Sequence, residues 1–225
     1  MERLPADPAE TAAPPPAGVS PAWWRLVLAG PLRQATVLDV GTGRGRIALA
    51  LAPLARRVIG IDRDAAAIAD ARCGAAALGL PNVDFLVRDA EGPGYEDLEP
   101  GLVTAHLCMS DAIAAHAGRA LPPGGLFAVV AFHTDQWKET GRASRFAYDE
   151  DRMRGVLEAS HLSVEQLDVE RHVECFGSVE EALAAAVGLQ EKWQADGRWF
   201  RYIKFLEEGG RTLTRARLVV TARRR

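Results

Sequence analysis

The run TVLDVGTGRGR, residues 36–46, decides how this 225-residue chain folds. Its first five residues are apolar or β-branched apart from Asp39, which is typical of a short buried strand. Gly41, Gly43 and Gly45 then let the backbone turn sharply and leave no side chain between it and a ligand. Apolar residues recur at helical spacing over 47–54. Strand, glycine loop and helix in this order indicate a nucleotide-type cofactor site at the carboxyl end of the first strand of an open α/β sheet.

The details of the glycine loop limit the type of cofactor. A dinucleotide fingerprint reads G-x-G-x-x-G, but Arg46 stands where the third glycine is expected. Asp39 lies two residues before the first glycine, and a carboxylate there suits a cationic amino group better than a pyrophosphate. The sequence also lacks the G-x-x-x-x-G-K-[ST] run of a P-loop. A nicotinamide-dependent oxidoreductase is therefore a less favoured reading.

The pattern D-x-G-x-G-x-G over residues 39–45 resembles motif I of the class I S-adenosylmethionine-dependent methyltransferases. The turn LPPGG at 121–125 is similar to the one that precedes strand five in that family. The resemblance is close over residues 36–133 and holds in outline elsewhere. It implies an α/β fold with a Rossmann-like, seven-stranded and mostly parallel sheet of order 3-2-1-4-5-7-6, flanked by helices.

Two acids at predicted strand ends extend the cofactor site. Asp62 ends a strand over 57–62, about twenty residues past the glycine loop, where a carboxylate can accept bonds from both ribose hydroxyls. The resemblance implies that Asp89 accepts a bond from the adenine amino group and that the N–H of Ala90 meets a ring nitrogen. The same resemblance implies S-adenosylmethionine as the cofactor and S-adenosylhomocysteine as the product. The predicted cofactor residues are Asp39, Gly41, Thr42, Gly43, Gly45, Asp62, Arg63, Asp89, Ala90 and Met109.

The remaining elements follow from periodicity and capping signals. Ser20 before Pro21 predicts a helix start, and S-x-x-E at 178–181 predicts a capping box. The predicted helices cover 65–78, 111–120, 149–160 and 178–194, with an aromatic helical turn over 199–206. Further strands are predicted at 83–88, 102–109, 125–132, 162–175 and 213–222.

Four ranges organise the chain. Residues 1–19 are rich in Pro and Ala and are expected to be disordered, so a single domain is expected over 20–225. Residues 134–150 form a long polar loop that we expect to belong to the substrate site. Residues 177–212 separate the sixth and seventh strands, so we expect a helical insertion there that either caps the substrate pocket or forms a dimer surface.

Methyl transfer from a sulfonium is an in-line displacement, so a proton acceptor is needed only if the nucleophile must lose a proton. The candidates by position are His133, Asp111 and Tyr148. His106, within a predicted strand, is read as a core histidine. The histidines and cysteines show no metal-ligand spacing, and no metal is expected.

Composition favours a small-molecule acceptor. A net charge of −3 gives no basic footprint for nucleic acid. After the fourth strand the chain reads MSDA at 109–112, unlike the Asn/Asp-Pro-Pro-Tyr motif of adenine amino-methylating enzymes. Cys108 follows Leu107, whereas cytosine-C5 enzymes place their nucleophilic cysteine after a proline. We expect no membrane association and a monomer or homodimer.

Three cysteines without a C-x-x-C pair suggest a reducing cytoplasm. The predominance of Arg over Lys, with abundant Ala, suggests a bacterial GC-rich genome. Two alternatives stay open: a non-catalytic S-adenosylmethionine-binding protein, and an aminopropyl transferase on the same fold.

Overall fold

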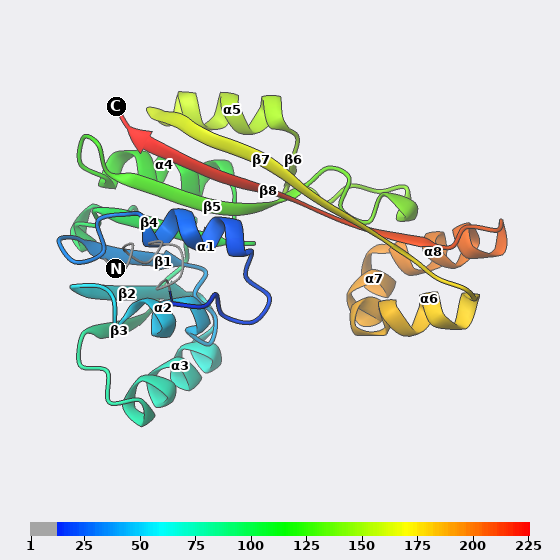
Figure 1. Ribbon diagram of the computed structural model, residues 1–225, viewed down its shortest axis with the longest axis horizontal. Helices are drawn as coiled ribbons and strands as arrows, with labels where there is room; N and C mark the ends of the chain where they lie inside the picture. The colour runs from blue at the N-terminus through cyan, green and yellow to red at the C-terminus, as the bar shows by residue number, and fades with distance from the viewer. Residues whose placement is uncertain (1–12) are drawn as a thin grey trace, which may run out of the picture. The chain divides into compact units, whose positions relative to one another are not determined.

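A computed structural model describes residues 13–225 (Figure 1). Most of the range expected to be disordered, residues 1–12, therefore lies outside the described residues. Within its last part, the carbonyl of Ala13 accepts a hydrogen bond from Trp24 Nε1 at 2.7 Å, and the carbonyl of Ala17 accepts one from the Arg46 guanidinium.

The strands of the described residues form one eight-stranded sheet of order β3-β2-β1-β4-β5-β8-β7, with β6 paired to β5. Since β7 and β8 are the sixth and seventh strands of the prediction, the predicted order is confirmed. The short β6 was not predicted. The strands are β1 (Thr36–Val40), β2 (Arg57–Asp62), β3 (Val83–Val87), β4 (Leu102–His106), β5 (Leu126–His133), β6 (Ala147–Tyr148), β7 (Leu162–Cys175) and β8 (Thr212–Arg224).

Most of the sheet is parallel, and β8 is the exception next to β5. The pairs β1–β2, β1–β4, β2–β3 and β4–β5 are all parallel. The N–H of Gly124 donates to Arg224 O at 2.8 Å, and the N–H of Arg224 donates to Gly125 O at 3.0 Å. The end of β8 thus meets the start of β5, as antiparallel strands do. The carboxyl ends of the central parallel strands therefore share one edge, where the glycine loop begins.

The helices begin where the capping signals place them. The Ser20 and Ser178 side chains accept bonds from Trp23 N and Glu181 N. The predicted helix over 178–194 is interrupted by a 3₁₀ turn at Val187–Leu189, which contains the poor helix former Gly188. The α-helices are α1 (Pro21–Leu28), α2 (Arg46–Leu51), α3 (Ala65–Ala77), α4 (Asp111–Ala120), α5 (Glu150–Ala159), α6 (Val179–Ala186), α7 (Gln190–Asp196) and α8 (Arg198–Glu207); the other 3₁₀ turns are η1 (Glu96–Leu98) and η2 (Lys138–Thr140).

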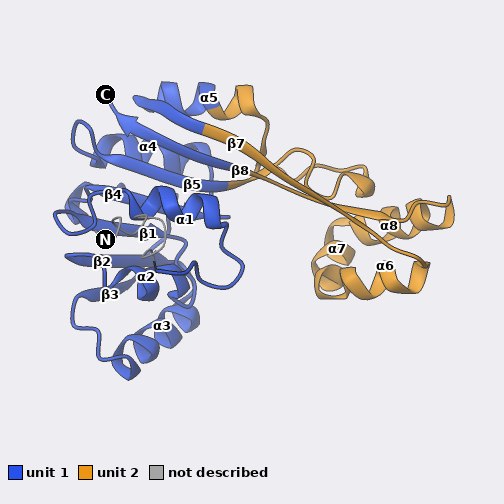
Figure 2. Cartoon of the chain, viewed as in Figure 1, with its two compact units in different colours: residues 1–130, 154–166, 219–225 blue, residues 131–153, 167–218 orange. Residues whose placement is uncertain are grey.

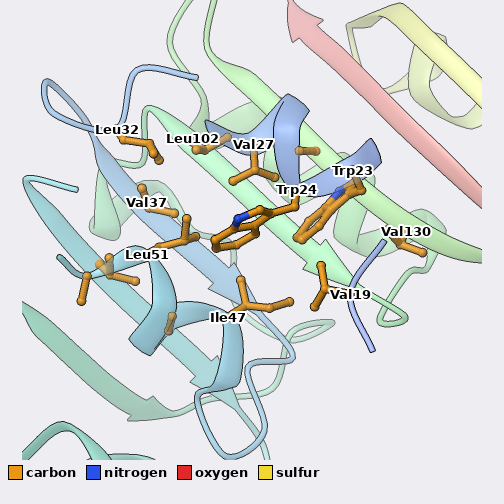
Figure 3. Packing of buried hydrophobic residues seen from close by; sticks show 14 of the residues in the cluster. Val19, Trp23, Trp24, Val27, Leu32, Val37, Ile47, Leu51, Leu102 and Val130 are labelled. Carbon is orange, nitrogen blue, oxygen red and sulfur yellow. The ribbon is translucent and has the colours of Figure 1, made fainter. Parts of the chain in front are cut away.

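The chain divides into two compact units (Figure 2). The first contains residues up to 130 with 154–166 and 219–225, and its core joins α1, α2 and α3 to one face of the sheet. Figure 3 shows Trp23 and Trp24 of α1 above the strands, beside Ile47 and Leu51 of α2. Both tryptophans are fully buried. They therefore anchor this core.

The second unit, residues 131–153 and 167–218, has a core of its own. Its aromatic rings follow one another edge to face: Trp137 lies 5.3 Å from Trp193, which lies 5.6 Å from Tyr202. The expected insertion at 177–212 supplies α6, α7 and α8 to this cluster. The expected substrate loop contributes Trp137, and Glu139 fastens it to β8 by accepting the N–H of Thr214 at 3.0 Å.

Removal of the Trp23 side chain should destabilise the first unit strongly. We expect Trp23→Ala to cost about 3–5 kcal/mol, because it leaves a cavity among fully buried neighbours. Thermal unfolding followed by circular dichroism should show a midpoint lower by roughly 6–20 °C. The control Leu78→Ala, at a side chain that is 64% exposed, should change the free energy of unfolding by no more than about 0.5 kcal/mol. A comparable loss in both variants would contradict the assignment of Trp23 to the core.

Candidate cofactor site

Asp39 lies beneath the glycine loop. Its carboxyl is 2% exposed and accepts hydrogen bonds from the hydroxyls of Thr42 at 2.7 Å and Thr104 at 2.9 Å. Burial raises the pKa of Asp39 to about 6, although the two hydroxyl bonds act in the opposite direction. The side chain thus ties the first turn of the loop to β1 and β4.

Two of the loop glycines have different surroundings. Gly41 has φ +67°, and a Cβ there would lie 2.4 Å from the sulfur of Cys108. Only a hydrogen atom fits between this backbone and the residues after β4. Gly43 has φ +54°, and a Cβ there would meet no atom within 4 Å. The loop is therefore packed at Gly41 and open at Gly43, where a ligand can approach the backbone.

Asp62 joins the end of β2 to the loop. Its Oδ2 accepts the N–H of Gly43 at 2.8 Å, and its Oδ1 accepts the N–H of Asp64 at 2.9 Å. Asp64 in turn caps α3 by accepting bonds from the N–H groups of Ala66 and Ala67. One carboxylate thus sets the position of the open glycine and the start of the next helix. The exposed Arg63 follows directly.

The turn after β3 is closed by local bonds. Asp89 accepts the N–H of Glu91 on Oδ1 at 2.9 Å, and its carbonyl accepts the N–H of Gly92 at 3.2 Å. The hydroxyl of Tyr95 donates to Ala90 O at 2.6 Å. Sequence reasoning missed Tyr95, because a tyrosine following Gly-Pro-Gly carries no motif.

Cys108 lies among the acids of the site and was also missed as a site residue. Burial raises the pKa of its thiol to about 11, and the carboxylates of Asp62, Asp39 and Glu91 act in the same direction. A negatively charged environment of this kind keeps the thiol protonated. Met109, which follows, is buried.

The candidate catalytic residues fall in different units. His133 and Tyr148 lie side by side in the register of β5 and β6 in the second unit. Nε2 of His133 lies 3.1 Å from Glu150 Oε2, and its Nδ1 accepts the N–H of Asp135 at 3.0 Å. Tyr148 is buried, with the Arg152 guanidinium 4.4 Å from its ring centre.

The third candidate, Asp111, belongs to the first unit, as does His106, which the sequence indicated as a core histidine. Asp111 is exposed at the start of α4, behind the N-cap Ser110. The ring of His106 lies 5.4 Å from that of Trp23, which is a core contact. Residues 13–225 contain no group of three or more His, Cys, Asp or Glu side chains placed to bind a metal ion. No helix in the described range is long and apolar enough to cross a membrane.

The family model described as "Methyltransferase domain" matches residues 32–202. The chain belongs to this methyltransferase family. The match covers the glycine loop, both strand-end acids and most of the second unit. With the sheet order described above, it confirms the resemblance to class I S-adenosylmethionine-dependent methyltransferases.

Solved structures of low sequence identity share the methyltransferase fold. YcgJ from Bacillus subtilis aligns with a TM-score of 0.70 and 16% identity over 91% of this chain and 98% of that one. A putative methyltransferase from Bacillus halodurans C-125 aligns with a TM-score of 0.65 and 19% identity. The alignment covers 90% of this chain and 96% of that one. The [4+2]-cyclase SpnF aligns with a TM-score of 0.63 and 21% identity, over 90% of this chain and 79% of that one. One fold therefore carries proteins named for different reactions.

A curated relative matches over a shorter stretch. The tRNA (uracil-5-)-methyltransferase homolog A of Mus musculus is 49% identical over 69 residues, which is 31% of this chain and 10% of that protein. The chain thus spans about a tenth of the length of this relative.

Family membership implies S-adenosylmethionine as the cofactor, and the residues at the strand ends fit it. The open backbone at Gly43 leaves room for a ligand to approach. Asp62 and Asp89 offer carboxylate oxygens, which accept bonds from hydroxyl and amino groups. The acidic surroundings suit a ligand that carries positive charge.

The two loop glycines should respond differently to a methyl group. We expect Gly41→Ala to cost about 1–3 kcal/mol more than Gly43→Ala in urea unfolding, because both strain a positive φ but only Gly41 would press a Cβ against Cys108. Gly43→Ala serves as the matched control. Equal losses in the two variants would show that the Cys108 contact does not restrict the loop.

The buried carboxyl of Asp39 should make stability depend on pH. Its pKa is raised from 3.8 to about 6, so the fold favours the protonated form. The contribution of Asp39 to the free energy of unfolding is therefore greatest below pH 4. It falls by about 3 kcal/mol as the pH rises through 6. We expect Asp39→Asn to exceed the wild type in unfolding free energy at pH 7.5 and to lose that advantage at pH 4.5. A difference that is constant with pH would contradict the assigned burial effect.

Proposed function

We propose that this chain transfers the methyl group of S-adenosylmethionine to a small-molecule acceptor. The observation that carries the proposal is the meeting of the open glycine at position 43 with the strand-end acid Asp62, whose carboxylate bonds directly to the loop backbone. An acid and a glycine loop at adjoining carboxyl ends of parallel strands form the cofactor crevice of open α/β sheets.

Five of the predicted cofactor residues receive a specific role in this proposal. Asp62 accepts bonds from the ribose hydroxyls, and Gly43 lets the backbone approach the ligand. Asp39 supplies negative charge beneath the cationic amino group. Asp89 and Ala90 contact the adenine edge. The other predicted members, which lie in the glycine loop or after β2 and β4, are Gly41, Thr42, Gly45, Arg63 and Met109.

S-adenosylmethionine supplies an electrophilic methyl group on a sulfonium. The chain then has to orient the acceptor in line with that methyl group, which can lower a barrier by roughly 7–11 kcal/mol at best. A general base adds about 10²–10⁴-fold where the acceptor must lose a proton. We propose His133, Asp111 and Tyr148 for this role. For His133, proton uptake on Nδ1 requires that this atom release the N–H of Asp135.

The proposal of a small-molecule acceptor is supported by the properties of the cysteine at this site. Methylation of a pyrimidine at C5 requires a thiolate that activates the ring, and a thiol with a raised pKa is a poor source of one. Among the described cysteines, the one at this site is Cys108, with a pKa of about 11. The uracil chemistry in the name of the murine relative is therefore disfavoured here. A net charge of −3 likewise gives no support for RNA binding.

We further propose a cytoplasmic bacterial enzyme that works as a monomer or homodimer. Three free cysteines support a reducing compartment. A non-catalytic binding protein and an aminopropyl transferase are the alternatives, and turnover assays with S-adenosylmethionine and its decarboxylated form distinguish them.

Calorimetric titration with S-adenosylhomocysteine tests the cofactor assignment. We expect wild-type binding to be weakened at least tenfold in Asp62→Ala, which removes the ribose acceptor and the bond to Gly43. NAD should give no heat. Asp84→Ala is the control, because Asp84 is exposed on β3 and its carboxylate pairs with Arg57 of the neighbouring strand at 2.9 Å, away from the glycine loop. Binding of NAD alone would refute the proposal.

A further inference from the structure

The segment between β3 and η1 has a sequence that favours mobility but a structure that is tightly closed. Residues 91–94 read Glu-Gly-Pro-Gly, and two glycines in four residues leave many backbone conformations open before folding. Three sets of contacts restrict this segment, and all lie within the first unit. Two of them join residues at opposite ends of the segment, and the third lies within the turn.

The first contact comes from Tyr95. Its side chain is fully buried, its hydroxyl donates to the Ala90 carbonyl at 2.6 Å, and its ring lies 5.2 Å from the imidazole of His116 on α4. Burial raises the pKa of the phenol above its usual value, so the hydroxyl stays a hydrogen-bond donor at any working pH. A buried tyrosine hydroxyl needs such a partner. The bond fixes the backbone on the carboxyl side of Ala90.

The second contact comes from Arg88. Its guanidinium binds both carboxylate oxygens of Asp97, at 2.9 and 2.8 Å, and donates to the carbonyl of Gly94. Its backbone N–H donates to Asp62 O at 2.9 Å, which joins the ends of β2 and β3. A bidentate pair of this kind restricts orientation as well as distance. The two ends of the segment are thus held together.

The third contact lies inside the turn. Asp89 accepts the N–H of Glu91 on Oδ1 at 2.9 Å, and this bond restricts the rotation of the carboxylate. The proposed function assigns two groups to adenine: the carboxylate of Asp89 and the N–H of Ala90. Both therefore belong to one turn that these three contacts hold in place.

We propose that Tyr95 is a positioning residue for recognition of the adenine base. Through its bond to the Ala90 carbonyl, it fixes the spacing between an acceptor, Asp89, and a donor, the Ala90 N–H. An acceptor followed by a donor complements the amino group and the adjacent ring nitrogen of a 6-aminopurine, which present a donor and an acceptor. A 6-oxopurine presents a carbonyl to the carboxylate and an N–H to the Ala90 N–H, so both contacts fail. The inference rests on the proposed function, because it assumes that this crevice takes S-adenosylmethionine.

The test measures base discrimination in Tyr95→Phe, which removes only the hydroxyl. Dissociation constants of S-adenosylhomocysteine and S-inosylhomocysteine are determined by calorimetry. The wild type should prefer the adenine ligand by tenfold or more. In the variant we expect the affinity for S-adenosylhomocysteine to fall about fivefold, as for one hydrogen bond, while the affinity for S-inosylhomocysteine changes little. The preference should therefore shrink, which general destabilisation would not cause.

Tyr202→Phe is the matched control. Tyr202 is also fully buried, and its hydroxyl donates to a backbone carbonyl, that of Thr212 at 3.2 Å, but in the second unit. We expect it to leave the discrimination unchanged. If Tyr95→Phe fails to fold, Asp97→Ala replaces it, because that side chain is 65% exposed; it should lower the preference in the same direction.

The outcomes separate the two proposals. If the wild type binds S-adenosylhomocysteine and the variant at position 95, or its substitute, keeps the full preference for adenine, the positioning role of Tyr95 is overturned and the proposed function stands. If the wild type binds neither purine ligand, the cofactor assignment itself fails, and the role of Tyr95 fails with it.

Discussion

The hydrogen bond from the Gly43 N–H to the Asp62 carboxylate is the contact on which the cofactor crevice depends. It joins the glycine loop after β1 to the end of β2. The parallel register of the two strands brings their carboxyl ends to the same edge of the sheet. Without it, the open backbone at Gly43 would have no fixed relation to the acid that follows β2. Packing of Gly41 against Cys108 and the buried bonds of Asp39 support the same loop from below. The carboxylate proposed to bind the cofactor therefore also fixes the geometry of the loop.

Local sequence determined this part of the molecule well. The strand before the loop, the turn at the glycines and the end of β2 at Asp62 could be predicted because each depends on residues adjacent in sequence. The strand order came from the resemblance to the methyltransferase family and is confirmed. The contacts of Cys108 and Tyr95 were not, since each pairs a residue with backbone that becomes its neighbour only through tertiary folding. The same holds for Trp137, predicted within a polar loop but buried with Trp193.

The second unit shows how an insertion can be accommodated. Its three helices bring Trp193, Trp199 and Tyr202 to a cluster separate from that of the first unit. A segment with its own apolar core takes little from the stability of the sheet that carries it. The single predicted helix over 178–194 missed the 3₁₀ turn because helical periodicity continues on both sides of Gly188.

The discontinuous composition of the two units has a consequence for biosynthesis. Strand β8 lies between β5 and β7 in the sheet, and its residues are shared by both units. The ribosome must therefore synthesise the chain as far as Arg224 before Gly124 and Gly125, directly before β5, find their hydrogen-bond partners. Until then the hydrogen-bonding edge of β5 is exposed, and unpaired edges attract other chains. Folding that waits for such distant pairings is slow, so this edge stays open while the whole of the second unit is being synthesised.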